Sequence, residues 1–239
     1  SQADYFQTVK GGGHGDYRLI TLAPASVQEM ADFVALGFDL AFKYNNPAII
    51  LADGIIGQMM EKVVLPPFRP RRTEEEIRKQ MPWATQGKLA GHKRNVITSL
   101  ELDPAIMEEN NIRFQAKYRK IEEAEVRYEE IGCENADYLM IAFGSMARIC
   151  LKTQEMALAE GIKVGVLRPI TLWPFPSKII AEYANKVKGM ISVELNAGQM
   201  VEDIRLAVNG KVKVEHFGRL GGIVPTPDEV LNALKQKLM

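Results

Sequence analysis

The second half of the sequence constrains the fold most, because strand and helix patterns alternate there regularly. Short apolar runs, each followed by a helical segment, predict right-handed crossovers and a mostly parallel sheet with helices on both faces. Thr226 and Glu229 form a capping box around Pro227, which marks the start of the last helix. The expected strands are residues 138–143, 163–167, 190–193 and 212–215, and the expected helices between them are residues 144–160, 177–186 and 200–209.

Near the beginning of the sequence we expect a single β-α-β unit. Residues 18–23 and 48–52 are apolar strands, the second covered on both faces, and Ser26 with Glu29 forms the capping box of the intervening helix. The apolar stripe of this helix is wide, so we expect deep burial. Two parallel strands and one helix leave bare sheet edges. We therefore expect this first domain to be incomplete, with its missing strands upstream or in a partner chain.

The middle of the sequence is irregular. Residues 66–72 form a stiff, basic, proline-rich connector, and residues 81–104 lack periodicity and are expected to pack on another subunit or to line a site. Pro104 opens a long helix whose apolar seam continues to Ile131, which predicts a helix lying across the domain surface. The predicted domains are residues 1–72, a linker with the long helix at residues 73–132, and residues 133–239.

Composition argues against several classes of protein. The 30 basic and 30 acidic residues cancel, which removes the electrostatic argument for nucleic-acid binding. The longest apolar runs are strand-sized and no signal segment is recognised, so we expect a cytoplasmic protein that does not span a membrane. Cys133 and Cys150 are too few for a disulfide framework or a four-thiolate cluster, and His14, His92 and His216 show no metal-ligand spacing. No metal site is therefore predicted in this chain.

Polar and aromatic residues follow the predicted strands at the carboxyl edge of the sheet, where α/β proteins carry their functional loops. Residues 163–176, KVGVLRPITLWPFP, are a strand followed by a proline-stiffened loop. Its aromatic residues are expected to pack on a neighbouring domain or a partner, and a plain connection to the next helix is the alternative. Arg219 beside two glycines fits either a phosphate cradle or a solvated side chain. The predicted interface residues are Trp173, Phe175, Glu194, Asn196, Gln199 and Arg219.

A glycine-rich motif at residues 11–16, GGGHGD, is the candidate for contact with a substrate or cofactor. Its glycines allow positive φ angles, and His14 can donate to a carboxylate or a phosphate. A glycine-rich turn with a surface histidine is an equally good interpretation. The predicted binding residues are His14, Gly15 and Asp16.

Several motifs resemble one family. LRPITLWPFP, SVELNAGQMVEDIRLAV and VEHFGRLGG, in this order, resemble the transketolase-C-terminal-type domain of 2-oxoacid:ferredoxin oxidoreductases, in the subunit usually called alpha. SQADYFQTVKGGGHGDYRLITLAPASVQEM is similar to the second half of that subunit's pyrimidine-type thiamine-diphosphate domain. WATQGKLAGHKRNVITSLELDP is most similar to the branched-chain, 2-oxoisovalerate type. The resemblance implies an α/β protein with a partial pyrimidine-type domain followed by a transketolase-C-terminal-type three-layer domain.

The resemblance also implies a chemistry. The family oxidatively decarboxylates a 2-oxoacid, transfers the acyl group to coenzyme A and reduces ferredoxin. Thiamine diphosphate with Mg²⁺ and [4Fe–4S] clusters are expected mainly on partner subunits, and none in this chain alone. Ala52-Asp53-Gly54 matches the family's cofactor signature only faintly, because the spaced asparagine is absent.

The resemblance places this chain in a hetero-oligomer. The family's activating glutamate is expected upstream of this sequence, so no catalytic residue is assigned and the chain alone is expected to be inactive. The expected partners are a beta subunit with the cofactor and a cluster, gamma and delta subunits, ferredoxin, coenzyme A and a second copy of the chain. The alternatives are a non-catalytic scaffold of the same complex and a subunit specific for 2-oxoglutarate.

Overall fold

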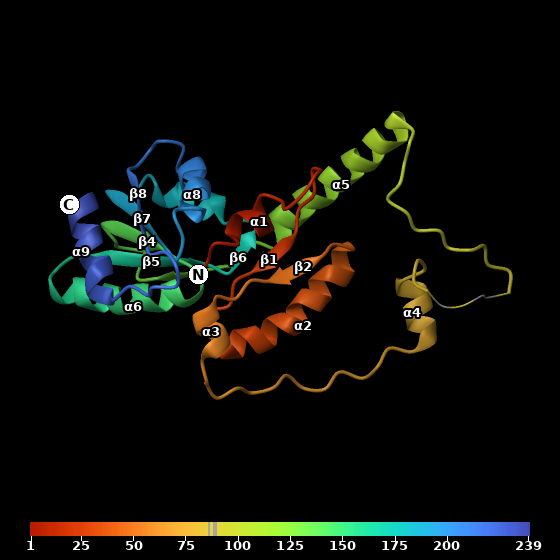
Figure 1. Cartoon of the computed structure of the whole chain (residues 1–239), viewed down its shortest axis with the longest axis horizontal. Helices are drawn as coiled ribbons and strands as arrows, with labels where there is room; N and C mark the ends of the chain where they lie inside the picture. The colour runs from red at the N-terminus through yellow and green to blue at the C-terminus, as the bar shows by residue number, and fades with distance from the viewer. Residues whose placement is uncertain (86, 88–89) are drawn as a thin grey trace. The chain divides into compact units, whose positions relative to one another are not determined.

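The computed structural model describes residues 1–85, 87 and 90–239 (Figure 1). The chain forms two compact units, residues 1–65 with 116–239 and residues 66–115. Residues 86, 88 and 89 of the predicted irregular excursion lie outside the described residues. The strands are β1 (Ile20–Leu22), β2 (Ala48–Ile50), β3 (Tyr128–Ile131), β4 (Tyr138–Ile141), β5 (Val164–Pro169), β6 (Thr171–Trp173), β7 (Gly189–Glu194) and β8 (Val214–Gly218). The helices are α1 (Tyr5–Val9), α2 (Val27–Tyr44), α3 (Gly54–Gln58), α4 (Glu74–Gln80), α5 (Pro104–Ala124), α6 (Gly144–Ala159), α7 (Ser177–Tyr183), α8 (Met200–Val208) and α9 (Pro227–Leu238).

The larger sheet has the strand order β3-β5-β4-β7-β8, and β5, β4, β7 and β8 run parallel (Figure 1). Its side chains alternate between two faces, as strand geometry requires. Leu139 and Ile141 of β4 belong to the core that α7 and α8 cover, whereas Met140 belongs to the core under α6 and α9. The prediction of a mostly parallel sheet with helices on both faces is confirmed.

Strand β3 corrects the predicted length of the long helix. Helix α5 ends at Ala124, and β3 pairs antiparallel with β5, with Tyr128 opposite Pro169 and Ile131 opposite Val166. The apolar spacing of residues 128–131 is compatible with a continuing helix. These residues instead form backbone hydrogen bonds with β5 at the edge of the sheet. The larger sheet therefore begins before the predicted boundary at residue 133.

The predicted β-α-β unit is confirmed. β1 and β2 are parallel, and Asn45 ends the connecting helix α2 in the left-handed conformation, with φ of 46°. Ser26 Oγ accepts a hydrogen bond from Glu29 N at 3.1 Å, as expected for the N-cap. The reciprocal half of the capping box differs, because the Glu29 carboxylate accepts from Ala25 N at 2.7 Å.

The expected deep burial of α2 and β2 is wrong. Along α2, Phe38 is 63% exposed, Val34 49% and Phe42 46%, and the rings of Phe38 and Phe42 stack with their centroids 6.5 Å apart. The residues of β2 are half-buried. Periodicity shows which side chains share a face of a helix, but it does not show whether the described chain covers that face.

Strand β6 adds a third strand to the small sheet from a distant part of the sequence. It pairs antiparallel with β1, so the small sheet has the order β2-β1-β6. The proline-stiffened stretch is thus partly a strand, which corrects its interpretation as a loop. Leu172 is fully buried, and Trp173 is 5% exposed and meets the Tyr118 ring edge-on with centroids 5.8 Å apart. This stretch joins the two sheets within one chain.

Residues 66–115 carry α4 and the start of α5. Thr73 and Glu76 form a capping box at the start of α4. The proline-rich residues 66–72 are exposed, and Phe68 is 88% exposed. The described residues between 81 and 103 form neither helix nor strand, as the lack of periodicity predicts. Their expected packing on another subunit stays a prediction.

Candidate functional site

The carboxyl edge of the larger sheet is organised by Glu194, the last residue of β7, which is fully buried. Its carboxylate accepts hydrogen bonds from Ser192 Oγ at 2.7 Å and from the backbone N–H groups of Met200 and Val201 at 2.8 and 3.0 Å. These N–H groups lie at the N-terminus of α8, where the helix dipole favours an anion. The chain therefore fills this anion position with its own carboxylate.

Asn196 and Gln199 hold the N-terminal segment of the same chain. Asn196 Nδ2 donates to the Gln2 carbonyl at 3.0 Å. Gln199 Oε1 accepts from Phe6 N and its Nε2 donates to the Ala3 carbonyl, both at 2.9 Å. The predicted rim of Glu194, Asn196 and Gln199 thus exists, and in this structure its partners are residues of its own chain. Binding to another chain stays a prediction.

Asp53 bridges the starts of two helices. Its Oδ1 accepts from the backbone N–H groups of Ile55 and Ile56 in α3, and its Oδ2 accepts from Ser145 N in α6 at 2.8 Å. Gln2 Nε2 donates to the same Oδ2 at 3.1 Å. Asp53 and Gln2 are 5% and 4% exposed. One buried carboxylate therefore ties the N-terminal segment, α3 and α6 together.

Gly144, the first residue of α6, makes this bridge possible. Its φ is +59°, in the left-handed region that glycine tolerates best. A Cβ atom at this position would lie 2.5 Å from Asp53 Oδ2 and 2.8 Å from Gln2 Nε2. Any larger residue would therefore displace the carboxylate from the helix.

Asp203 of α8 holds both ends of helix α1. Its Oδ2 accepts a hydrogen bond from the Tyr5 hydroxyl at 2.6 Å, and its Oδ1 forms an ion pair with Lys10 Nζ. Burial, together with the Asp203 carboxylate, raises the pKa of Tyr5 well above its ordinary value, so Tyr5 remains a donor. Lys10 leads directly into the glycine-rich motif.

A hollow of about 430 Å³ lies beside this clamp. Within the motif, Gly11 has φ of 99°, and Gly12 N donates to the Tyr17 hydroxyl at 2.6 Å. The predicted binding residues 14–16 are exposed and are not part of the hollow's lining. Residues Phe6, Gln7, Lys10, Gly11, Gly12 and Glu202 line the hollow.

The other predicted interface residues lie in different settings. Trp173 is buried within the chain and Phe175 is half-buried. Arg219 Nη1 pairs with Glu229 Oε1 at 3.0 Å across the surface. A partner chain can reach Phe175 and Arg219 directly, whereas Trp173 already packs inside its own chain.

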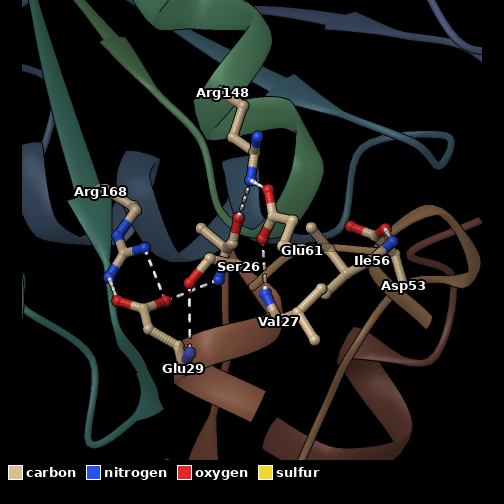
Figure 2. A network of polar contacts seen from close by, with 9 residues as sticks. Ser26, Val27, Glu29, Asp53, Ile56, Glu61, Arg148 and Arg168 are labelled. Atoms are coloured by element: carbon tan, nitrogen blue, oxygen red, sulfur yellow. Dashed lines mark hydrogen bonds and ion pairs between the residues drawn. The ribbon is translucent and has the colours of Figure 1, made fainter. Parts of the chain in front are cut away.

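A second polar network, which the sequence did not predict, fixes the start of α2 (Figure 2). Arg168 of β5 binds the Glu29 carboxylate in a bidentate manner at 2.9 and 2.6 Å, and Arg168 is only 5% exposed. Arg148 of α6 binds Glu61 at 2.7 Å. A backbone hydrogen bond from Val27 N at 3.0 Å, and the Arg148 guanidinium, lower the pKa of Glu61.

Sequence reasoning missed Gln2, Asp53, Asp203 and Arg168 as parts of these networks. Asp53 and its partner Ser145 are 92 residues apart in sequence, and Tyr5 and its partner Asp203 are 198 residues apart. A local signal existed only for Asp53, because aspartate before a short helix is a favoured N-cap.

Two helix starts that could hold an anion are filled by carboxylates of this chain. Within residues 1–85, 87 and 90–239, no three His, Cys, Asp or Glu side chains gather as metal ligands. Asp53 and Glu194 occupy the starts of α6 and α8, which are positions where phosphates bind in other α/β proteins. Both cysteines are free and buried, and burial raises the pKa of Cys133 to about 11. The chain's own carboxylates therefore already accept the backbone N–H groups at the starts of these two helices.

Within the described part of the chain, no helix combines the length and the apolar character needed to cross a bilayer.

By fold, the chain belongs with the α/β proteins seen in oxidoreductase and transketolase structures. A solved 2-oxoglutarate:ferredoxin oxidoreductase from Magnetococcus marinus, with 2-oxoglutarate, coenzyme A and succinyl-CoA bound, matches with a TM-score of 0.79 and 24% identity, over 100% of this chain and 45% of that one. A split-gene transketolase in an inactive beta4 tetramer matches with a TM-score of 0.50 and 14% identity, over 92% of this chain and 57% of that one.

The chain belongs to the pyruvate flavodoxin/ferredoxin oxidoreductase family. Residues 1–132 match the family model described as pyruvate flavodoxin/ferredoxin oxidoreductase, thiamine diP-bdg, and residues 136–230 match pyruvate:ferredoxin oxidoreductase core domain II. The family resemblance carried by the sequence motifs is thereby confirmed.

Within this family, the chain is more similar to VorB subunits than to KorA subunits. The ketoisovalerate oxidoreductase subunit VorB of Methanothermobacter marburgensis is 47% identical over 235 residues, which cover 98% of this chain and 65% of that protein. VorB of Methanothermobacter thermautotrophicus is 46% identical with the same coverage. The 2-oxoglutarate synthase subunit KorA of M. marburgensis is 31% identical, over 98% of this chain and 68% of that protein. The chain thus spans slightly less than two thirds of the VorB relatives.

Proposed function

We propose that this chain is part of the alpha subunit of a 2-oxoisovalerate:ferredoxin oxidoreductase. In the proposed reaction, the 2-oxoacid loses carbon dioxide, its acyl group forms a thioester with coenzyme A, and two electrons pass singly to ferredoxin. The supporting observation is the difference in identity between relatives of two specificities. VorB reaches 47% and KorA 31%, each over 98% of this chain.

The proposed contribution of this chain is to form walls of an active centre that other subunits complete. Thiamine diphosphate with Mg²⁺, which supplies the carbanion chemistry in such enzymes, and the [4Fe–4S] clusters belong in this proposal to partner subunits. The filled starts of α6 and α8 support this division of labour. The exposed residues His14, Gly15 and Asp16 would then face the substrate from this chain.

The proposed assembly contains a beta subunit, gamma and delta subunits, and a second copy of this chain, and it uses coenzyme A and ferredoxin. Its proposed location is the cytoplasm. The relatives support an assembly because VorB and KorA are each named as subunits.

The decisive experiment is to purify the complete complex containing this chain and to assay a panel of 2-oxoacids by ferredoxin reduction and acyl-CoA formation. We expect kcat/KM for 2-oxoisovalerate to exceed that for 2-oxoglutarate at least about tenfold. This ratio corresponds to a difference of about 1.4 kcal/mol in the free energy of transition-state binding. Equal or higher activity with 2-oxoglutarate would refute the substrate assignment.

The role of the glycine-rich motif can be tested in the same complex. His14→Gln is expected to raise KM for the 2-oxoacid, since it replaces the imidazole at an exposed position of the motif. Glu182→Gln is the control, because Glu182 is exposed on α7. Identical kinetics for both variants would contradict a substrate contact by His14.

A non-catalytic scaffold role is the second candidate, because the polar groups of the rim are already bound within the chain. It predicts that the double variant Phe175→Ala, Arg219→Ala loses partner subunits. The subunits that stay assembled should bind thiamine diphosphate with the same affinity as the parent complex. Size-exclusion chromatography beside the parent complex tests this. Unaltered assembly would count against docking by these residues.

A further inference from the structure

Helix α1 is too short to be stable by itself. It contains five residues, Tyr5–Val9, whereas isolated helices shorter than about 12–15 residues are marginal in water. Its position must therefore be set by contacts with the rest of the chain. The residue after it, Lys10, continues directly into Gly11, so the position of α1 determines where the glycine-rich motif begins.

The contacts that set this position converge on one carboxylate. Asp203 binds Tyr5, the first residue of α1, at 2.6 Å and also pairs with Lys10, the residue that caps its end. Asp203 is 9% exposed and Tyr5 is fully buried, so water competes little for the Tyr5 hydrogen bond. A single side chain thus clamps both ends of the helix.

Asp203 is itself held firmly. It lies in the first turn of α8, and the start of α8 is fixed by Glu194, whose carboxylate accepts from Met200 N at 2.8 Å. Gln199, immediately before α8, accepts from Phe6 N at 2.9 Å and so adds a third attachment to α1. The clamp therefore connects α1 to a rigid element of the larger sheet.

The same clamp shapes the hollow beside it. Phe6, Gln7 and Gly11 line it from α1 and the motif, and Glu202, the neighbour of Asp203, lines it from α8. A shift of α1 would change the width of the hollow and move the motif.

We propose that Asp203 is a positioning residue for the oxidoreductase reaction: by clamping Tyr5 and Lys10, it fixes the glycine-rich motif of residues 11–16 at the place where the substrate is bound. This inference rests on the proposed function. It assigns to α8 a role in catalysis although Asp203 touches neither substrate nor cofactor.

Amide hydrogen exchange of the complete complex tests the structural half of the proposal. Asp203→Asn removes the charge that holds Lys10, and we expect exchange to accelerate at least about tenfold in residues 5–16, while β4, β5 and β7 keep their rates. Glu182→Gln is the matched control, because Glu182 is exposed on α7. Unchanged rates in residues 5–16, or equal acceleration throughout the chain, would overturn the proposal.

Kinetics of the same variants test the catalytic half. We expect kcat/KM for the 2-oxoacid to fall at least about tenfold in Asp203→Asn, with partial recovery in Asp203→Glu, whereas the control keeps parent values. Tyr5→Phe and Lys10→Met should be non-additive, because both remove partners of one carboxylate. Normal kcat/KM in an Asp203→Asn complex with accelerated local exchange would overturn a catalytic positioning role.

The two failures are distinguishable. If the parent complex shows no 2-oxoacid-dependent ferredoxin reduction, the proposed function fails, and Asp203 then has no catalytic role to perform. If the parent complex is active and the Asp203→Asn complex is equally active, the proposed function stands and the positioning role fails. The exchange experiment reports on the clamp in either case.

Discussion

Replacing Gly144 by alanine tests the bridge that Asp53 forms between α3 and α6. The new Cβ would lie 2.5 Å from Asp53 Oδ2, closer than any ordinary van der Waals contact, so the carboxylate must leave Ser145 N. The residue must also hold φ at +59°, which costs a non-glycine residue about 1–2 kcal/mol.

The expected loss of stability has two parts. Backbone strain contributes about 1–2 kcal/mol, and losing hydrogen bonds to a buried carboxylate contributes about 1.5–3 kcal/mol. We therefore expect the free energy of unfolding of Gly144→Ala to fall by about 2.5–5 kcal/mol. Urea titration followed by circular dichroism measures this quantity.

Gly161→Ala is the matched control. Gly161 also has a left-handed backbone, with φ of 78°, but a Cβ there meets nothing within 4 Å among the described residues. It should lose only the strain part, about 1–2 kcal/mol. If the two variants lose the same stability, the buried carboxylate bridge contributes nothing and the reasoning is refuted.

Three further predictions concern charge and thiol chemistry. Arg168→Met should lower the free energy of unfolding by about 3–5 kcal/mol, because it leaves a partner carboxylate without its cation, whereas Arg78→Met in an exposed pair should lose less than about 0.5 kcal/mol in the same urea titration. Desolvation raises the pKa of Glu125, but hydrogen bonds from three neighbouring side chains outweigh it and leave the pKa lowered. Stability from Glu125 is therefore present above its unfolded pKa of about 4.3 and is lost as pH falls through the folded value, so Glu125→Gln should flatten the acid limb of a stability–pH curve; an unchanged limb would contradict this. Burial raises the pKa of Cys133 to about 11 and that of Cys150 further, so Ellman's reagent at pH 7.5 should titrate both thiols only after unfolding in urea, and rapid reaction of the native chain would refute their burial.

Local patterns identified much of the fold. The helix starts at Ser26 and Thr226 are short-range events, since an N-cap side chain needs only a backbone N–H three residues away. The alternation of apolar strands and helices after residue 137 follows equally local periodicities, which is why the parallel sheet was predictable. Family motifs, which are also contiguous in sequence, identified the family.

Two of the places that the same local reasoning misread show its limit. Tyr128 and Ile131 continue the helical spacing of α5, but they form a strand that pairs with β5. Phe38 and Phe42 belong to a genuine apolar stripe, yet they are exposed in this structure. In both cases the structure depends on which part of the chain packs against the segment, and the periodicity of apolar residues does not show this.

By itself, therefore, the sequence determined the alternation of strands and helices after residue 137, several helix starts and the family. Tertiary structure decided how the parts are joined: β6 pairs with β1, Asp53 binds the start of α6, and Asp203 holds α1. The physical reason is range. Propensity and capping act between residues a few positions apart, whereas Tyr5 and Asp203 meet across 198 positions only after the sheets have packed.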